Sequence, residues 1–148
     1  MVAAVLTALL TTRRSKTETR WKAKYDAYSR ILSSIEDIRY WAEETYASNL
    51  LLPSIGGDQL DAATKRFHEA KRVLWSYVHV GALVVSEDVR EKLDDFLVAI
   101  GSEEHRFEED VRDDDDYSTD LADHCDKIRN LVTERLPGLL ASARSDIR

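Results

Sequence analysis

The chain has 148 residues, of which 43% are hydrophobic and 33% are charged, with 5 Gly, 2 Pro and 1 Cys. This length suits one domain that buries about two-thirds of the surface of its unfolded chain. So few Gly and Pro argue against a many-stranded sandwich or barrel, which needs a turn about every ten residues. The single Cys excludes an internal disulfide framework and a Cys-rich zinc module, and is typical of a reducing compartment. The composition predicts a soluble, mainly helical, acidic domain.

The formal net charge of −7 conceals two segments of opposite charge. Residues 1–24 hold one acid, Glu18, and six bases, for a net charge of +5, and these bases are Arg13, Arg14, Lys16, Arg20, Lys22 and Lys24. Between Glu103 and Asp126, twelve acids stand against two bases, for a net charge of −10. The rest of the chain is nearly neutral, so the two charged segments are the first places to look for function.

Residues 2–10 form an apolar run that the basic residues follow directly. A secretory signal has its positive charges before the apolar stretch, so this order argues against one. The run is about half of the ~20 residues that a membrane-spanning helix needs, yet a following Arg pair is typical of the cytoplasmic end of an anchor. Three interpretations of residues 1–14 stay open: the first turns of a soluble helix, an interfacial anchor, or the stub of a shortened transmembrane segment. Residues 15–148 form the predicted bundle domain.

The first predicted helix begins near residue 15, because Ser15 and Glu18 have the spacing of a capping box. Pro53 and the pair Gly56-Gly57 predict its end. Between these signals, apolar residues recur every three or four positions, as they do on the buried face of an amphipathic helix. The stripe consists of Trp21, Tyr25, Tyr28, Ile31, Leu32, Ile35, Ile38 and Ala42.

Two further stripes predict helices over about 58–80 and from about residue 87. The first has Asp58 as its expected N-cap and consists of Leu60, Ala63, Phe67, Ala70, Leu74, Tyr77 and Val78. The second has Ser86 as its expected N-cap and consists of Val89, Leu93, Phe96, Leu97 and Ile100. Gly101 closes this helix unless Phe107 and Val111 extend it. Residues 81–85 suit a strand or a helix end, and the lack of a partner strand favours the helix end.

A fourth stripe follows the expected N-cap at Ser118 or Thr119, and consists of Leu121, Cys125, Ile128, Val132 and Leu136. Pro137-Gly138 interrupts it, so residues 139–147 form either a short fifth helix or a kinked continuation. Four stripes joined by modest loops predict an all-α antiparallel four-helix bundle. Periodicity does not tell a bundle within one chain from one completed by a second copy, so a homo-oligomer stays open.

Sequence motifs for nucleotide binding, zinc proteases and serine hydrolases are absent from the chain. No His has a Glu three residues before it, as the ferritin-like carboxylate site requires. Asp120 and His124 share one helix face, but a second pair of metal ligands is missing. The sequence therefore predicts no catalytic residue, no metal and no cofactor, and Cys125 is expected to pack in the core as a small hydrophobe.

The acidic segment is expected to be a solvated connection between two helices. It is no EF-hand, because no register supplies alternating ligands, a central Gly and a terminal Glu together. The alternative is a docking surface for a basic partner. That surface consists of Glu108, Glu109, Asp110, Asp113, Asp114, Asp115 and Asp116.

Trp21 and Tyr25 lie among basic residues, a pattern that can stack on single-stranded nucleic acid. The net charge of −12 on the residues after Lys24 repels phosphate, so no nucleic-acid partner is expected. Because both aromatic residues begin the first apolar stripe, packing in the core or anchoring at a membrane interface is favoured.

Residues 20–28 contain the pattern Trp21-x-x-Lys24-x-x-Ala27-Tyr28, and residues 85–93 and 143–147 are charged helical segments. Together they resemble a loose group of small, largely uncharacterised bacterial helical proteins. Members of that group often have an N-terminal membrane anchor, followed by such an aromatic and basic entry into a cytoplasmic bundle. The resemblance implies this topology and no activity.

Three functional hypotheses follow. The leading one is a non-enzymatic interaction protein with an unknown protein partner, facing the cytoplasm and tethered to an anionic inner membrane surface through its N-terminus. The second is a soluble acidic inhibitor or immunity-type protein that docks a basic partner through residues 103–126. The third is a metal-dependent hydrolase centred on Asp120 and His124.

Overall fold

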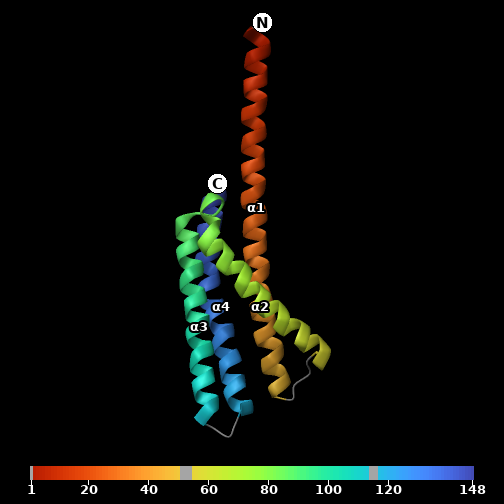
Figure 1. The fold of residues 1–148 in the computed structure, drawn as a ribbon, viewed down its shortest axis with the longest axis vertical. Helices are drawn as coiled ribbons and strands as arrows, with labels where there is room; N and C mark the ends of the chain where they lie inside the picture. The colour runs from red at the N-terminus through yellow and green to blue at the C-terminus, as the bar shows by residue number, and fades with distance from the viewer. Residues whose placement is uncertain (1, 51–54, 114–116) are drawn as a thin grey trace.

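The computed structural model describes residues 2–50, 55–113 and 117–148, and side chains from Lys16 onwards except that of Asp113. Four α-helices follow one another: α1 (Val2–Asn49), α2 (Gly57–Val80), α3 (Glu87–Asp113) and α4 (Tyr117–Ile147). A short 3-10 helix, η1 (Gly81–Leu83), joins α2 to α3. Successive helices run in opposite directions, and the described residues include no strand (Figure 1). The predicted all-α four-helix bundle is confirmed.

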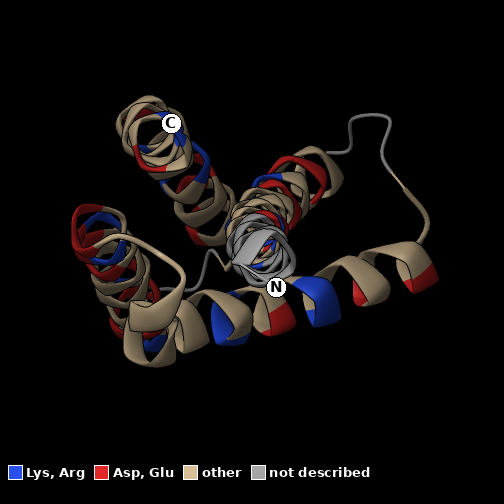
Figure 2. Ribbon diagram, turned by 90° about the horizontal axis from the view of Figure 1, so that it is seen from above, with Lys and Arg blue, Asp and Glu red and all other residues tan. Residues whose placement is uncertain are grey.

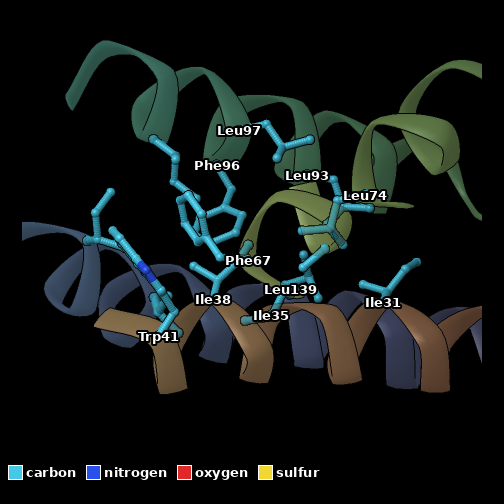
Figure 3. Close-up of a cluster of buried hydrophobic side chains, with 14 of the residues drawn as sticks. Ile31, Ile35, Ile38, Trp41, Phe67, Leu74, Leu93, Phe96, Leu97 and Leu139 are labelled. Atoms are coloured by element: carbon cyan, nitrogen blue, oxygen red, sulfur yellow. The ribbon is translucent and has the colours of Figure 1, made fainter. Parts of the chain in front are cut away.

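The four helices surround one hydrophobic core. α1 packs against α2 and α4, and α3 packs against the same two helices. Viewed along α1, α2 crosses it at a steep angle while α3 and α4 lie next to each other (Figure 2). Every helix supplies fully buried side chains to this core, among them Ile31, Ile38, Phe67, Leu74, Leu93, Ile100, Ile128 and Val132 (Figure 3). The apolar stripes of the sequence are therefore the faces that meet in the bundle.

Only the C-terminal part of α1 belongs to the bundle. Among its described side chains, which start at Lys16, the first buried ones are Ala27 and Tyr28, and those from Lys16 to Ala23 are all exposed. The remainder of the helix extends past the other three, as Figure 1 shows. At 1.5 Å per residue, residues 2–22 project by ~30 Å.

The predicted start of the first helix near residue 15 is wrong, because α1 already begins at Val2. Residues 2–14 contain no Gly or Pro and several Ala and Leu, which favour a helix. The capping-box spacing of Ser15 and Glu18 therefore falls inside a helix. The helix also crosses the predicted boundary between residues 14 and 15.

Three other predicted helix ends need correction. The N-cap of α2 is Gly56 rather than Asp58, and α4 begins at Tyr117, just before Ser118 and Thr119. Gly101 does not end α3, which continues to Asp113 as the Phe107 and Val111 alternative predicted. Ion pairs three and four residues apart follow Gly101 and stabilise that extension.

Two predictions about the segment between α2 and α3 are confirmed. Ser86 caps α3, because its hydroxyl accepts a hydrogen bond from the backbone N–H of Val89 at 3.4 Å. Residues 81–83 continue α2 as a helical turn rather than a strand.

Pro137 lies inside α4, so no separate fifth helix follows it. The turns after this proline stay packed because Leu139 and Ala143 are buried in the core.

We expect Leu93→Ala to lower the free energy of unfolding by about 2–5 kcal/mol, because it leaves a cavity in a fully buried part of α3. The matched control is Val98→Ala on the same helix, where the side chain is 55% exposed. That substitution should change stability by less than about 0.5 kcal/mol. Urea titration followed by circular dichroism measures both, and equal effects would contradict the placement of α3.

Candidate functional site

The basic residues predicted as a patch divide between the projecting part of α1 and the bundle. Lys16, Arg20 and Lys22 are exposed on the projecting part. Lys24 is partly buried, and its Nζ lies 2.8 Å from Oδ1 of Asp146 in an ion pair. The side chains of Arg13 and Arg14 lie outside the described residues, although their backbone is helical. The free basic surface is therefore carried by the exposed helix, and Lys24 belongs to the end of the bundle.

Trp21 and Tyr25 do not pack in the core, so that expectation is wrong. Each is 53% exposed, and their rings stack on each other with centroids 5.6 Å apart and planes 16° apart. Both precede Ala27, the first of the described α1 side chains to be buried. Anchoring at an interface stays a prediction for this aromatic pair.

Asp146 joins three elements at the point where α1 leaves the bundle, and we call this group the Asp146 clasp. The carboxylate accepts hydrogen bonds from Lys24 and from the hydroxyl of Tyr28. It also accepts one from the backbone N–H of Ser86 at 3.2 Å, just before α3. The clasp thus connects α1, the start of α3 and the end of α4.

The clasp perturbs two pKa values in opposite directions. Although burial opposes ionisation of Asp146, the hydrogen bonds from Lys24 and Tyr28 hold the pKa of its carboxyl below the ordinary value. Burial and the hydrogen bond to Asp146 raise the pKa of Tyr28 to about 12. The favoured state near neutral pH is an ionised carboxylate that accepts from a neutral phenol.

The predicted acidic docking surface is only partly within the described residues. Glu108, Glu109 and Asp110 are exposed near the C-terminal end of α3. The side chain of Asp113 and all of Asp114, Asp115 and Asp116 lie outside what the structure describes.

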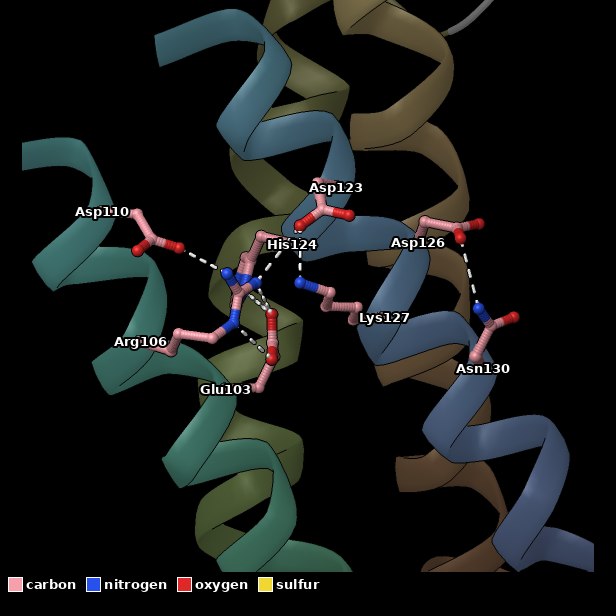
Figure 4. Close-up of polar contacts among 8 residues, drawn as sticks. All are labelled: Glu103, Arg106, Asp110, Asp123, His124, Asp126, Lys127 and Asn130. Atoms are coloured by element: carbon pink, nitrogen blue, oxygen red, sulfur yellow. Dashed lines mark hydrogen bonds and ion pairs between the residues drawn. The ribbon is translucent and has the colours of Figure 1, made fainter. Parts of the chain in front are cut away.

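Some of the neighbouring acids are paired within the molecule (Figure 4). Arg106 forms ion pairs with Glu103 and Asp110 on its own helix and with Asp123 of α4 at 3.3 Å. Lys127 lies 2.6 Å from the same Asp123 carboxylate. The hydrogen bonds that Arg106 donates to Glu103, together with the charges of the nearby acids, raise the pKa of Arg106. Arg106 is already counted in the net charge of −10, so of the two cations only Lys127 adds positive charge to this segment.

His124 lies buried behind this ion-pair network. Its side chain stacks on Phe107 with ring centroids 4.5 Å apart and meets the Trp41 ring edge-on at 6.1 Å. Its Nδ1 lies 3.5 Å from Oε1 of Glu103, too far for a strong hydrogen bond. Burial lowers the pKa of His124, and the attraction of Glu103 only partly offsets this. The imidazole is therefore held in its neutral form as part of the packing.

The metal interpretation of Asp120 and His124 finds no support in the geometry. Within the described ranges, no group of three or more His, Cys, Asp or Glu side chains could hold a metal ion. Cys125 is fully buried, as the sequence predicted, and burial raises the pKa of its thiol to about 12. A buried thiol with a raised pKa stays protonated near neutral pH, and Cys125 packs in the core as a small hydrophobe.

Sequence reasoning missed the Asp146 clasp and the Glu103–Arg106–Asp123 network. Asp146 is 122 residues from Lys24 in the chain, and no periodicity or motif marks the pair. The sequence predicted Ser86 only as a helix cap and not as a hydrogen-bond donor to Asp146. The spacing of Glu103, Arg106 and Asp110 at threes and fours was the one local signal available for the second group.

Comparisons of the chain with models of known families, with curated proteins and with solved structures found no match. Among the described residues, no helix combines the length and the apolar character needed to cross a bilayer.

We expect Asp146→Asn to lower the free energy of unfolding by about 1–3 kcal/mol, because it leaves Lys24 without a charged partner and weakens two hydrogen bonds. The pKa of Tyr28 should fall from about 12 towards its ordinary value, which titration of phenolate absorbance measures. Asp61→Asn, at an exposed position of α2, is the control that should change neither quantity. An unchanged Tyr28 titration in Asp146→Asn would contradict the clasp.

We expect the protein to lose stability as the pH falls below about 6.5, where the unfolded chain takes up a proton that folded His124 resists. Because folding lowers the pKa of His124, its contribution to stability is fully present above pH 6.5. That contribution is lost as the pH falls towards the pKa of His124 in the folded protein. The slope is at most ~1.4 kcal/mol per pH unit for one proton. His124→Leu should flatten this slope, whereas His105→Leu, at an exposed position, should keep it. Identical slopes in urea titrations between pH 7.5 and 5.5 would rule out a buried neutral imidazole.

Proposed function

We propose that this chain is a non-enzymatic interaction protein whose bundle is held at an anionic membrane surface, such as a cytoplasmic leaflet, by the projecting part of α1. The observation that carries the proposal is the single uninterrupted helix from Val2 to Asn49, of which only the part from about Ala27 is buried in the bundle. The free part consists of an apolar run at 2–10 followed by exposed Lys16, Arg20 and Lys22.

The magnitudes favour reversible attachment through two weak contributions. Residues 2–10 cover ~13 Å of helix, so these residues alone reach across less than half of a ~30 Å hydrocarbon layer. Each base near an anionic surface contributes ~1 kcal/mol, and this attraction fades beyond a Debye length of ~8 Å. An apolar run and a basic segment together are the pair of signals that peripheral proteins use for stable membrane binding.

The absence of catalysis in this proposal is supported by what the polar side chains do. His124 and Cys125 pack in the interior, and the acids around Arg106 are engaged in ion pairs. An acidic inhibitor that captures a basic partner stays the alternative, because Glu108 and Glu109 are exposed on α3. In this proposal, the projecting part of α1 binds the membrane and the bundle binds a protein partner there.

We expect the protein to float with vesicles that contain phosphatidylserine and much less with neutral phosphatidylcholine vesicles, because the basic part of α1 requires anionic headgroups. Reversing the three described charges, with Lys16→Glu, Arg20→Glu and Lys22→Glu together, should weaken binding by about a hundredfold or more.

The matched control makes the same change of net charge elsewhere, with Lys65→Glu, Arg72→Glu and Arg135→Glu on exposed positions of α2 and α4. It should bind anionic vesicles within a few-fold of the native protein. If both triple variants bind equally well, or if the native protein stays unbound, the membrane proposal is wrong.

A further inference from the structure

The turn between α2 and α3 exposes two large apolar side chains. Leu83 in η1 is 94% exposed and Val80, just before it, is 75% exposed. These are the highest exposures among the large hydrophobic side chains that the structure describes. Figure 1 shows this turn at the end of the bundle from which α1 projects.

The same turn lies beside α1 on the side that carries its free bases. Val84, next to Leu83, lines an open groove together with Tyr77 and with Ala23 and Ala27 of α1. Lys16 and Arg20 precede Ala23 by seven and three residues, which places them on the same face of the helix. Asp26 also lines the groove, and Arg30 beside it balances that charge. The bases and the apolar turn therefore lie on one side of the molecule.

We propose that the Val80–Leu83 turn is a second contact with the bilayer, entering the headgroup region of an anionic membrane while α1 lies inclined to the surface. This inference rests on the proposed membrane attachment of α1 and specifies the orientation of the bundle. The occupant follows from the chemistry of this side, because Val80 and Leu83 are exposed on the turn and Lys16 and Arg20 are exposed on the face of α1 that continues to Ala23 in the groove.

An upright α1 would not produce this contact. From Leu10, where the apolar run ends, to Ala23 at the level of the groove, the helix rises by ~20 Å. The headgroup layer is only ~5–8 Å thick on each side, so an upright helix leaves Leu83 in water. An inclined helix brings Leu83, Lys16 and Arg20 to the surface together.

The test places an environment-sensitive fluorophore on the turn. Leu83→Cys and Val98→Cys each replace an exposed hydrophobic residue, and Val98 lies on α3, outside the proposed contact. Cys125 is fully buried and is replaced by Ser in both proteins to prevent its labelling. Mixed with vesicles that contain phosphatidylserine, the label at position 83 should shift to shorter wavelength and the label at 98 should not. A shift at both positions, or at neither, would overturn the proposed orientation.

Flotation of the same proteins separates this inference from the proposed function. Vesicle binding without a shift at position 83 overturns the inclined orientation and leaves attachment through α1 standing, whereas no binding at all removes both. In unlabelled protein, Leu83→Gln should weaken binding to these vesicles about tenfold, and Val98→Gln should leave it unchanged. Equal affinities of the two variants would contradict a contact at Leu83.

Discussion

The carboxylate of Asp146 is the group on which the direction of α1 depends. It binds Lys24 and Tyr28 of α1 and the backbone just before α3, all from the last turn of α4. Towards the C-terminus from this point, α1 is buried between α2 and α4, and towards the N-terminus its described side chains are exposed. One partly buried anion thus sets where the bundle ends and the free helix begins.

The helical periodicity of the sequence predicted most of the fold, because apolar residues at threes and fours have to meet in a common core. Local signals located the helix ends less well. The prediction of Ser86 as an N-cap was correct because its hydroxyl can reach the first turn of α3. The predictions from Ser15 and Gly101 were wrong. A capping pattern or a single glycine does not interrupt a helix when the residues on both sides of it favour the helical conformation. Trp21 and Tyr25 continue the buried stripe in sequence, yet both are exposed where α1 leaves the bundle.

The sequence predicted the charge of the two candidate segments but not which of their charged side chains are free. The basic segment before residue 25 and the acidic segment after residue 102 are visible in the composition. Which of those charges are free is decided by tertiary contacts between residues far apart in the chain. Lys24 forms an ion pair with Asp146 and is thereby withdrawn from the predicted basic patch, and Arg106 reaches across from α3 to Asp123 of α4. What remains is a basic helix at one end of the bundle and, at the other, an acidic segment in which Arg106 and Lys127 pair some of the carboxylates.

Hydrogen–deuterium exchange along α1 tests most directly the claim that this helix is half packed and half free. In the protein alone, amides from about Tyr28 onwards should be protected by the bundle, while those before Lys24 should exchange much faster because only a solvated helix holds them. Anionic vesicles should slow exchange in the free part and leave the packed part unchanged. Equal protection on both sides of Lys24 without vesicles, or no change on adding them, would contradict the account.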